Sequence, residues 1–386
     1  MKKIALFHPV DDMYGASNIL VYTLALLSDT YACHVYVPKI TGSMAQRLSE
    51  INKTKNVFFH ELGDLPLVYR AMYTPKGIIE WVVKNIKLMM FLFKKRNEFT
   101  FFYVNTLSLF TIPLMVGLLG KKSLTHCHEY LAGSLYGKII KYVIALSPTL
   151  VLSVSQHVDT YIKTRRNSSR YLVIHNGIPD SSQTMTVSNS DYLIGKINYA
   201  LVGRVMPEKG HWFLLDTLEY MSESERKKII VHIYGDAPPT RYHLMQDFKN
   251  EVNLRGLTDS IVIHGFDSNA SQKIAFMDVC LVPSIMADPF PTTVLEATRC
   301  GRPVIATNHG GASEVINNEV NGLLIAPHDI TSFANAINKL SNMSEVQRDS
   351  IGKMGRKNYE ESFNINAYEK RFLNVVRSHI LNGDVV

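Results

Sequence analysis

Two carboxylates flank a tight turn in the stretch from Val282 to Ile316. Asp288 stands eight positions before Glu296, and the turn Pro289–Pro291 lies between them. An apolar strand is expected to end just before the turn, and a helix just after it. Carboxylates beside a strand end and a helix N-terminus suit a ligand that carries hydroxyl groups and phosphates.

Two cations follow an earlier apolar strand. Arg204 comes directly after Gly203, and Lys209 directly before Gly210. Across a turn they could clamp a diphosphate, the arginine as a fork and the lysine as a point charge. The alternative is a pair of solvated loop charges.

Small residues mark other strand ends. Gly15 and Ala16 open a helix without bulky side chains, so backbone N–H groups there can approach an anion. Gly235 and Gly265 follow two strands of the second half, where a flat ring could reach the backbone. Ordinary turn glycines are the competing interpretation at each position.

The run His126-Cys127-His128-Glu129 has the residue types of a metal site. His126 and His128 share one face of a strand, but no further Cys/His pair completes the site. We therefore predict no metal, and we favour His128 as a polar group at a strand end, with Glu129 available to orient it.

These residues must be positioned by strands that alternate with helices in both halves, which predicts an α/β chain. We expect two doubly wound, parallel-sheet, Rossmann-like domains that present a cleft at the carboxyl ends of their strands. The boundaries we predict are a first domain at 1–178, a polar linker at 179–194, a second domain at 195–365 and a C-terminal helix at 366–386 that packs back on the first domain.

The uncharged segment Phe99–Gly120 has the length of a membrane span. Its aromatic front and polar break at Asn105 favour a buried strand and then a buried helix interrupted by Pro113. The N-terminus lacks the apolar core of a signal peptide and predicts a first strand. Four scattered cysteines indicate reduced thiols and a cytosolic protein.

Charge is shared unevenly along the chain. Residues 1–190 hold 21 Lys+Arg and 11 Asp+Glu, whereas residues 191–386 hold 20 and 23. The basic half suggests an anionic partner, which is nucleic acid, an anionic membrane surface or a lipid-phosphate substrate. No nucleic-acid-binding module is recognisable, and the G-x-G-x-x-G, phosphate-loop and G-x-S-x-G patterns are also absent.

Taken together, the motifs resemble the retaining glycosyltransferases of family 4, which have the GT-B fold and include builders of bacterial surface polysaccharide such as O-antigen and capsule. The ordered set is GRVMPEKG, YGD, HGF, PS, D-x7-E, EATRCGRPVIAT, HGGASEV and NGLLI. The resemblance covers nearly the whole chain and is strongest over residues 195–330.

The resemblance implies a role for each site residue. Glu296 would hold the ribose of a nucleotide sugar, and Asp288 would contact hydroxyls of the donor sugar. Arg204 and Lys209, with Gly203 beside them, would clamp the diphosphate, and Gly15 with Ala16 would belong to the loop that closes on the phosphates. His128 would be the cleft histidine. Backbone at Gly235, Gly265 and Phe266 would meet the base edge, and the loop of Phe290, Pro291, Thr292 and Thr293 would meet the sugar through its amides.

Two departures from the family pattern concern the donor sugar. Asp288 replaces a glutamate, and Pro291 replaces a glycine and so lacks an N–H group. The resemblance implies metal-independent transfer of a hexosyl or deoxyhexosyl group with retention, without a cofactor. Alternatives are a catalytically silent nucleotide-sugar-binding scaffold and a nucleotide-sugar epimerase.

The first half is expected to bind a lipid-linked or saccharide acceptor. Val82–Arg96 has the pattern of a basic amphipathic helix for an anionic membrane face, and a core helix with a solvated basic end is the alternative. These features predict a cytoplasmic protein held peripherally on the inner face of the plasma membrane.

Overall fold

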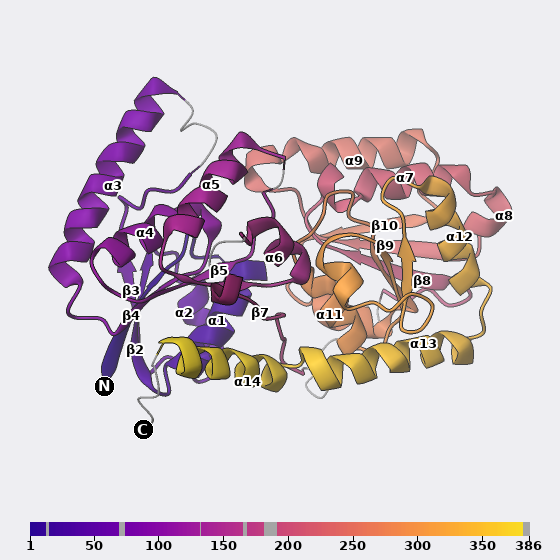
Figure 1. Cartoon of the computed structure of the whole chain (residues 1–386). Coiled ribbons are helices and arrows are strands. Elements are labelled where there is room, and N and C mark those ends of the chain that lie inside the picture. The colour runs from indigo at the N-terminus through magenta and orange to yellow at the C-terminus, as the bar shows by residue number, and fades with distance from the viewer. Residues whose placement is uncertain (13–14, 69–73, 132, 165–167, 181–190, 381–386) are drawn as a thin grey trace. The chain divides into compact units, whose positions relative to one another are not determined.

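The computed structural model describes residues 1–12, 15–68, 74–131, 133–164, 168–180 and 191–380. The chain divides into two units (Figure 1). Unit 1 comprises Met1–Asn176 and Tyr368–Val386, and unit 2 comprises Gly177–Ala367. Most of the predicted linker, residues 181–190, lies outside the described residues.

Unit 1 is built on a seven-stranded parallel sheet in the order β3-β2-β1-β4-β5-β6-β7. The chain order reverses direction between β1 and β4, which is where doubly wound sheets bind ligands. The strands are β1 (Lys2–Phe7), β2 (Tyr31–Val37), β3 (Val57–Glu61), β4 (Phe101–Val104), β5 (Ser123–Cys127), β6 (Leu150–Ser153) and β7 (Tyr171–Val173).

Helices cover both faces of this sheet. One layer contains α1 (Gly15–Leu27), α2 (Ser43–Glu50) and α14 (Ile365–Val375); the other contains α3 (Pro75–Lys95), α4 (Thr111–Leu118) and α5 (Leu135–Leu146); α6 (Gln156–Ile162) follows β6. From α14, Tyr368 is fully buried and its hydroxyl lies 2.7 Å from the Thr23 hydroxyl of α1. The C-terminal helix thus contributes to the unit 1 core.

The uncharged segment Phe99–Gly120 folds into the core, as predicted, but its helix is not interrupted. Pro113 lies in the first turn of α4, where its missing N–H group has no partner to lose. Among the described residues, no helix combines the length and the apolar character needed to cross a bilayer.

Unit 2 contains a six-stranded parallel sheet in the order β10-β9-β8-β11-β12-β13. Its order reverses between β8 and β11. The strands are β8 (Ile197–Val202), β9 (Ile229–Tyr234), β10 (Ile261–Gly265), β11 (Val279–Val282), β12 (Val304–Thr307) and β13 (Leu323–Ile325). Both sheets establish the predicted α/β fold.

The helices of unit 2 also form two layers. They are α7 (His211–Tyr220), α9 (His243–Leu254) and α12 (Ile330–Ser341) on one face, α10 (Ala270–Lys273), α11 (Thr292–Arg299) and α13 (Glu345–Asn358) on the other, and the short α8 (Glu223–Arg226). Ser344 begins α13 with a capping box that it shares with Gln347. A single π-helical turn, Tyr359–Phe363, continues α13.

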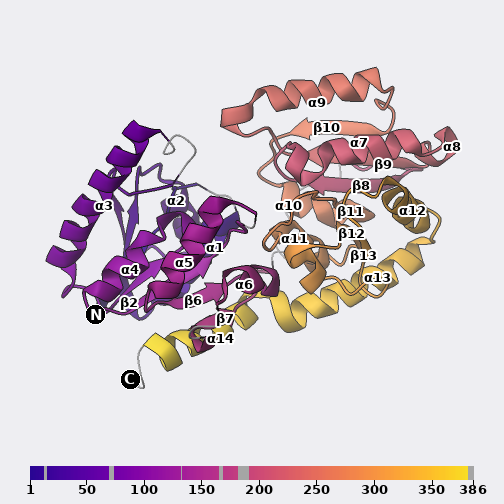
Figure 2. The same cartoon turned by 45° about the horizontal axis from the view of Figure 1, so that its top comes forward.

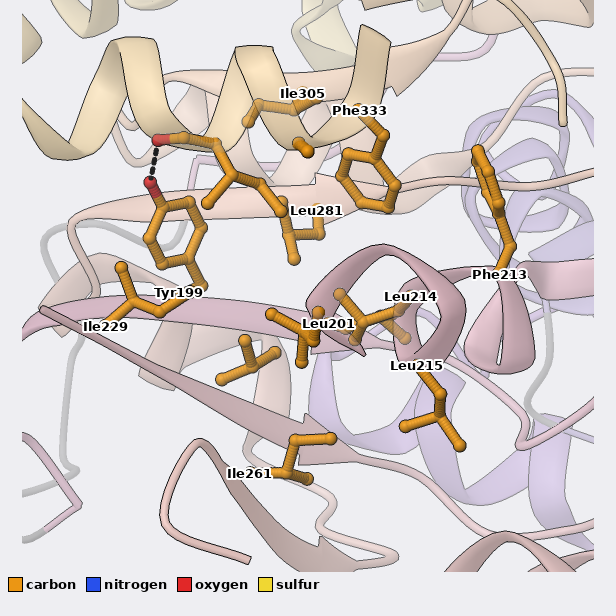
Figure 3. Packing of buried hydrophobic residues seen from close by; sticks show 14 of the residues in the cluster. Tyr199, Leu201, Phe213, Leu214, Leu215, Ile229, Ile261, Leu281, Ile305 and Phe333 are labelled. Carbon is orange, nitrogen blue, oxygen red and sulfur yellow. Dashed lines mark hydrogen bonds between the residues drawn. The ribbon is translucent and has the colours of Figure 1, made fainter. Parts of the chain in front are cut away.

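Apolar side chains from β8, α7 and α12 pack together in the core of unit 2 (Figure 3). Phe213 and Phe333 lie with ring centroids 5.2 Å apart, and both are buried. The Tyr199 hydroxyl donates to the Ile337 carbonyl at 3.0 Å, so this buried tyrosine leaves no polar atom unpaired. The core fixes β8 and α7, between which lies the loop with Arg204 and Lys209.

Candidate functional site

Three glycines end neighbouring strands of unit 2. The Gly203 N–H donates to the Tyr234 carbonyl at 2.9 Å, and the Gly235 N–H donates to the Gly265 carbonyl at 2.7 Å. A Cβ atom on Gly235 would lie 1.9 Å from the Gly203 oxygen, so only glycine fits there. Phe266 directly follows Gly265, and it is 70% exposed.

The loops that follow β8 and β11 are tied together. The Glu208 carbonyl accepts from the backbone N–H groups of Ile285 at 3.1 Å and Met286 at 3.3 Å. Gly210, at φ +84°, approaches so closely that a Cβ would lie 1.9 Å from the Pro283 oxygen. The two loops at the topological switch point therefore form one rigid assembly.

Lys209 and Asp288 form an ion pair across these two loops. The Asp288 side chain is 17% exposed and the Lys209 side chain 40% exposed, so the lysine remains accessible while the carboxylate holds it. Arg204 lies half-buried in the same loop as Lys209. The sequence pattern placed Asp288 at the sugar, and the structure adds that it positions the lysine.

The turn after Asp288 leads into the N-terminus of α11. Pro291 is the residue before the helix, and no side chain caps it. The Thr293 hydroxyl donates to the Val202 carbonyl at 3.4 Å, whereas Thr292 is half-buried. Phe290 is buried, with its ring 6.0 Å from that of Phe363, so only its backbone is available to a ligand.

Glu296 lies on the second turn of α11. Its carboxylate forms no hydrogen bond or ion pair with the residues that the structure describes. Burial raises its pKa, and the nearby Arg299 charge partly opposes that rise. A half-buried carboxylate without a hydrogen-bond donor suits a ligand with hydroxyl donors.

The sequence analysis assigned no supporting role to two further parts of this assembly. Gly310, at φ +62°, and Gly311 open a short 3₁₀ helix, Gly310–Glu314. The Gly311 N–H donates to the Asp288 carbonyl at 2.9 Å, and a Cβ on Gly310 would lie 2.2 Å from that oxygen. These glycines therefore allow close packing against Asp288. From the sequence alone, a glycine pair that packs closely looks the same as one that forms an anion-binding turn.

The other missed support is Arg241, just before α9. Its guanidinium pairs with Glu208 at 2.9 Å, which links a third strand-end loop to the β8–α7 loop. No sequence pattern joins two residues so far apart. The pair was detectable only in the structure.

Unit 1 carries a polar cluster at its own switch point. His8 follows β1, Asn105 follows β4 and His128 follows β5. The Asn105 amide nitrogen lies 3.2 Å from His8 Nδ1, and its oxygen lies 3.0 Å from His128 Nε2. His8 and Asn105 escaped the sequence prediction, although the position directly after a central parallel strand is a usable signal.

Counting donors assigns the protons in this cluster. The Tyr103 hydroxyl donates to the Asn105 oxygen at 2.9 Å, so that oxygen is an acceptor and His128 Nε2 must carry the proton. Because burial and two neighbouring histidines, His126 and His8, hold its pKa well below the usual 6.5, His128 is neutral. His128 therefore presents Nδ1 as a hydrogen-bond acceptor.

Glu129 does not orient the His128 ring, contrary to the prediction. Its carboxylate accepts from the backbone N–H groups of Leu107 at 3.0 Å and His128 at 3.1 Å and from the Thr106 hydroxyl. It therefore shapes the loop backbone, while Asn105 holds the ring. The residues that the structure describes contain no group of three His, Cys, Asp or Glu side chains that could hold a metal ion.

The N-terminus of α1 borders the same cluster. The helix begins at Gly15, where an added Cβ would meet no atom within 4 Å. The Ala16 carbonyl accepts from the Asn105 amide at 3.3 Å, and Ser17 joins His8 to Asp12. Space at Gly15 leaves its backbone open to a ligand.

Acidification is expected to destabilise unit 1 through its buried histidines. Burial lowers the pKa of His8 to about 4 and that of His126 to about 3. The unfolded chain, with ordinary pKa values near 6.5, binds protons that the folded unit excludes. Stability is therefore complete above pH ~6.5 and falls as the pH drops toward 4, by about 2 kcal/mol per histidine at pH 5.

Urea unfolding at pH 7.5, 6 and 5 measures this loss. His126→Leu is the matched variant. Nε2 of His126 has no partner among the described residues, and Tyr103, which loses its 2.7 Å hydrogen bond with His126 Nδ1, keeps its bond to Asn105. Its stability should fall less steeply with pH than that of the wild-type chain. Equal slopes would contradict the assignment of His126 as a buried neutral group.

The paired sheets with their switch-point loops define a GT-B fold. The Anabaena protein HepE, solved in complex with UDP and glucose, superposes with a TM-score of 0.80 over 98% of this chain and 100% of its own, at 19% identity. That likeness concerns the fold. The predicted GT-B architecture is confirmed.

Residues 196–343 match the family model described as Glycosyl transferases group 1. The chain is 25% identical over 255 residues to O-antigen chain mannosyltransferase C of Escherichia coli, covering 63% of this chain and 65% of that relative. It is 26% identical over 139 residues to the UDP-Gal:alpha-D-GlcNAc-diphosphoundecaprenol alpha-1,3-galactosyltransferase of Escherichia coli, covering 36% and 35%. The matches thus span less than two thirds of each relative. The resemblance to glycosyltransferases is confirmed.

Proposed function

We propose that the chain transfers a hexosyl or deoxyhexosyl group, with retention, from a nucleotide sugar to a lipid-linked saccharide or glycolipid acceptor during surface polysaccharide synthesis. The observation that carries the donor assignment is Glu296, a half-buried carboxylate that forms no hydrogen bond or ion pair with the described residues. It follows Asp288 by eight positions, beside the N-terminus of α11. A ribose with two adjacent hydroxyl donors satisfies such a carboxylate.

In this proposal Lys209 and Arg204 stabilise the leaving nucleoside diphosphate. Lys209 is held by Asp288 before any ligand binds, and a preorganised charge spends no reorganisation energy during the reaction. These side chains supply the positive charge, and the proposed reaction uses no metal or cofactor. The bond from the anomeric carbon to the diphosphate oxygen breaks, and the oxygen of the acceptor hydroxyl bonds to that carbon on the same face. The departing diphosphate oxygen takes the proton of that hydroxyl.

The rest of the site would position the sugar and the base. Backbone N–H groups at Thr292 and Thr293 point from the start of α11. Gly265 ends the edge strand β10, and Phe266 follows it directly. On unit 1 by itself, His128 presents Nδ1 as an acceptor that suits a sugar hydroxyl. The named activities of the two Escherichia coli relatives support a saccharide or polyprenol-linked acceptor.

A scaffold that binds nucleotide sugars without turnover is the second candidate. Pro291 removes an N–H group at the turn, and Asp288 is engaged with Lys209 rather than free for the sugar. An epimerase on the same fold is a third candidate, which rests on fold analogy alone.

A panel of nucleotide sugars, incubated with the protein and with and without an extract of lipid acceptors, separates the three candidates. The transferase releases nucleoside diphosphate only with acceptor present. Donor binding without release supports the scaffold, and conversion of the donor without acceptor supports the epimerase.

We also propose that the protein acts in the cytoplasm at the inner face of the plasma membrane, where a lipid-linked acceptor is presented. The basic, partly exposed helix α3 supports this location.

A further inference from the structure

Helix α3 exposes an apolar stripe although it belongs to a folded unit. Leu88 and Leu92 face the core, and the opposite face carries exposed apolar side chains. They recur every three or four positions, which places them on one line of the helix. This α3 stripe consists of Ile79, Val83, Ile86, Met90 and Phe93, all between 44% and 65% exposed.

Helix α5 has a second stripe that its sequence alone did not reveal. Ile140 and Ile144 are fully buried, whereas Leu135, Ile139, Tyr142 and Leu146 are exposed at intervals of four, three and four. Leu135 is 75% exposed and Tyr142 is 66% exposed. A monomeric soluble domain rarely turns two regular apolar stripes to water.

The two helices belong to one layer. Helix α4 contacts both α3 and α5, and Figures 1 and 2 show all three on the same face of the unit 1 sheet. An aromatic bridge joins them, because the Phe110 ring lies 6.0 Å from Trp81 of α3 and 6.3 Å from Tyr136 of α5. The exposed sides of both helices therefore contribute to a single outer surface, with Leu118 of α4 also exposed on this layer.

Cations border this surface. From Lys76 to Arg96 there are six basic residues and one acidic residue, Glu80, and α5 carries two lysines and no acid. Lys76, Lys87 and Lys94 are spaced by eleven and seven positions, so they follow one line beside the α3 stripe. Lys94 and Lys138 form no ion pair with the described residues.

We propose that the α3 and α5 stripes form one docking face that lies on a bilayer containing anionic phospholipids. Apolar side chains and Tyr142 enter the interfacial region, and the bordering lysines meet lipid phosphates. A second copy of the chain fits less well, because a two-fold contact would bring the lysine rows of both copies together. The inference deepens the proposed membrane location and does not depend on the proposed reaction.

Flotation of the full chain with vesicles tests the docking face without any nucleotide sugar. We expect binding to vesicles of phosphatidylcholine with about 30% phosphatidylglycerol, and weakening of that binding as salt rises. The double variant Ile139→Ser/Tyr142→Ser on α5 and the double variant Met90→Ser/Phe93→Ser on α3 should each weaken binding about tenfold or more. Leu254→Ser, an 81% exposed leucine on α9 of unit 2, is the matched control and should bind as the wild-type chain does.

Three outcomes would overturn the proposal. They are equal binding to vesicles without phosphatidylglycerol, wild-type binding by the α5 variant, and a wild-type dimer in buffer that the α5 variant dissociates. Nucleoside diphosphate release with detergent-dispersed acceptor should stay within threefold of wild type in both double variants. Loss of vesicle binding with preserved release separates this face from the donor site, and failure of release in the wild-type chain bears only on the proposed reaction.

Discussion

Replacing Lys209 by alanine is expected to reduce kcat/KM for nucleotide-sugar turnover by about 10²- to 10³-fold. The substitution removes the cation that Asp288 holds in place and leaves that carboxylate without its partner. A negative charge of Asp288, 17% exposed, would then face the leaving diphosphate. Initial rates of nucleoside diphosphate release at several donor concentrations measure the effect.

Two further variants serve as comparisons for Lys209→Ala. Lys249→Ala changes an exposed lysine on α9 and should leave kcat/KM unchanged. Asp288→Asn keeps the shape of the side chain but releases the lysine, so part of the loss should appear in that variant as well. An activity of Lys209→Ala within threefold of wild type would remove Lys209 from the site.

Gly210→Ala is expected to destabilise unit 2 by about 2–4 kcal/mol. Its Cβ would lie 1.9 Å from the Pro283 oxygen and 2.7 Å from the Pro283 carbonyl carbon, and neither backbone atom can move away cheaply. The β8–α7 loop must then shift away from β11, and Lys209 shifts with it. Thermal unfolding should show a lower melting temperature, and donor affinity should fall in parallel.

Gly256→Ala isolates the steric part of this effect. Gly256 also has positive φ, +62°, but an added Cβ would meet nothing within 4 Å. Only the backbone strain of about 1–2 kcal/mol should remain there. Equal destabilisation by the two substitutions would show that the contact with Pro283 contributes nothing.

The alternation of strands and helices was predictable because buried parallel strands are continuous apolar runs. Helices whose ends carry little periodicity were harder. We predicted an amphipathic helix over Val82–Arg96, but α3 begins at Pro75, where the Thr74 side chain accepts from the Gly77 N–H at 3.1 Å. Helix α2, Ser43–Glu50, buries only Met44 and Leu48, so its sequence carries little apolar periodicity.

The site was predictable only as far as local patterns reach. Glu296, Asp288 and the glycines at strand ends stand out by spacing, so their places in the sequence could be read directly. The Lys209–Asp288 pair joins residues 79 positions apart, and the Asn105–His128 bond joins residues that follow two different strands. Such contacts depend on the order of the strands in the sheet, and no single sequence motif predicts that order.

Calorimetric titration of UDP, GDP, ADP and TDP into the wild-type chain and into Glu296→Gln tests the donor assignment most directly. Our account predicts that at least one diphosphate binds the wild-type chain. It also predicts that Glu296→Gln weakens that binding about 10- to 100-fold, because a charged acceptor is lost. Glu223→Gln, at a 71% exposed glutamate on α8, should leave the affinity unchanged. Absence of binding by all four diphosphates, or equal affinity in wild type and Glu296→Gln, would contradict the account.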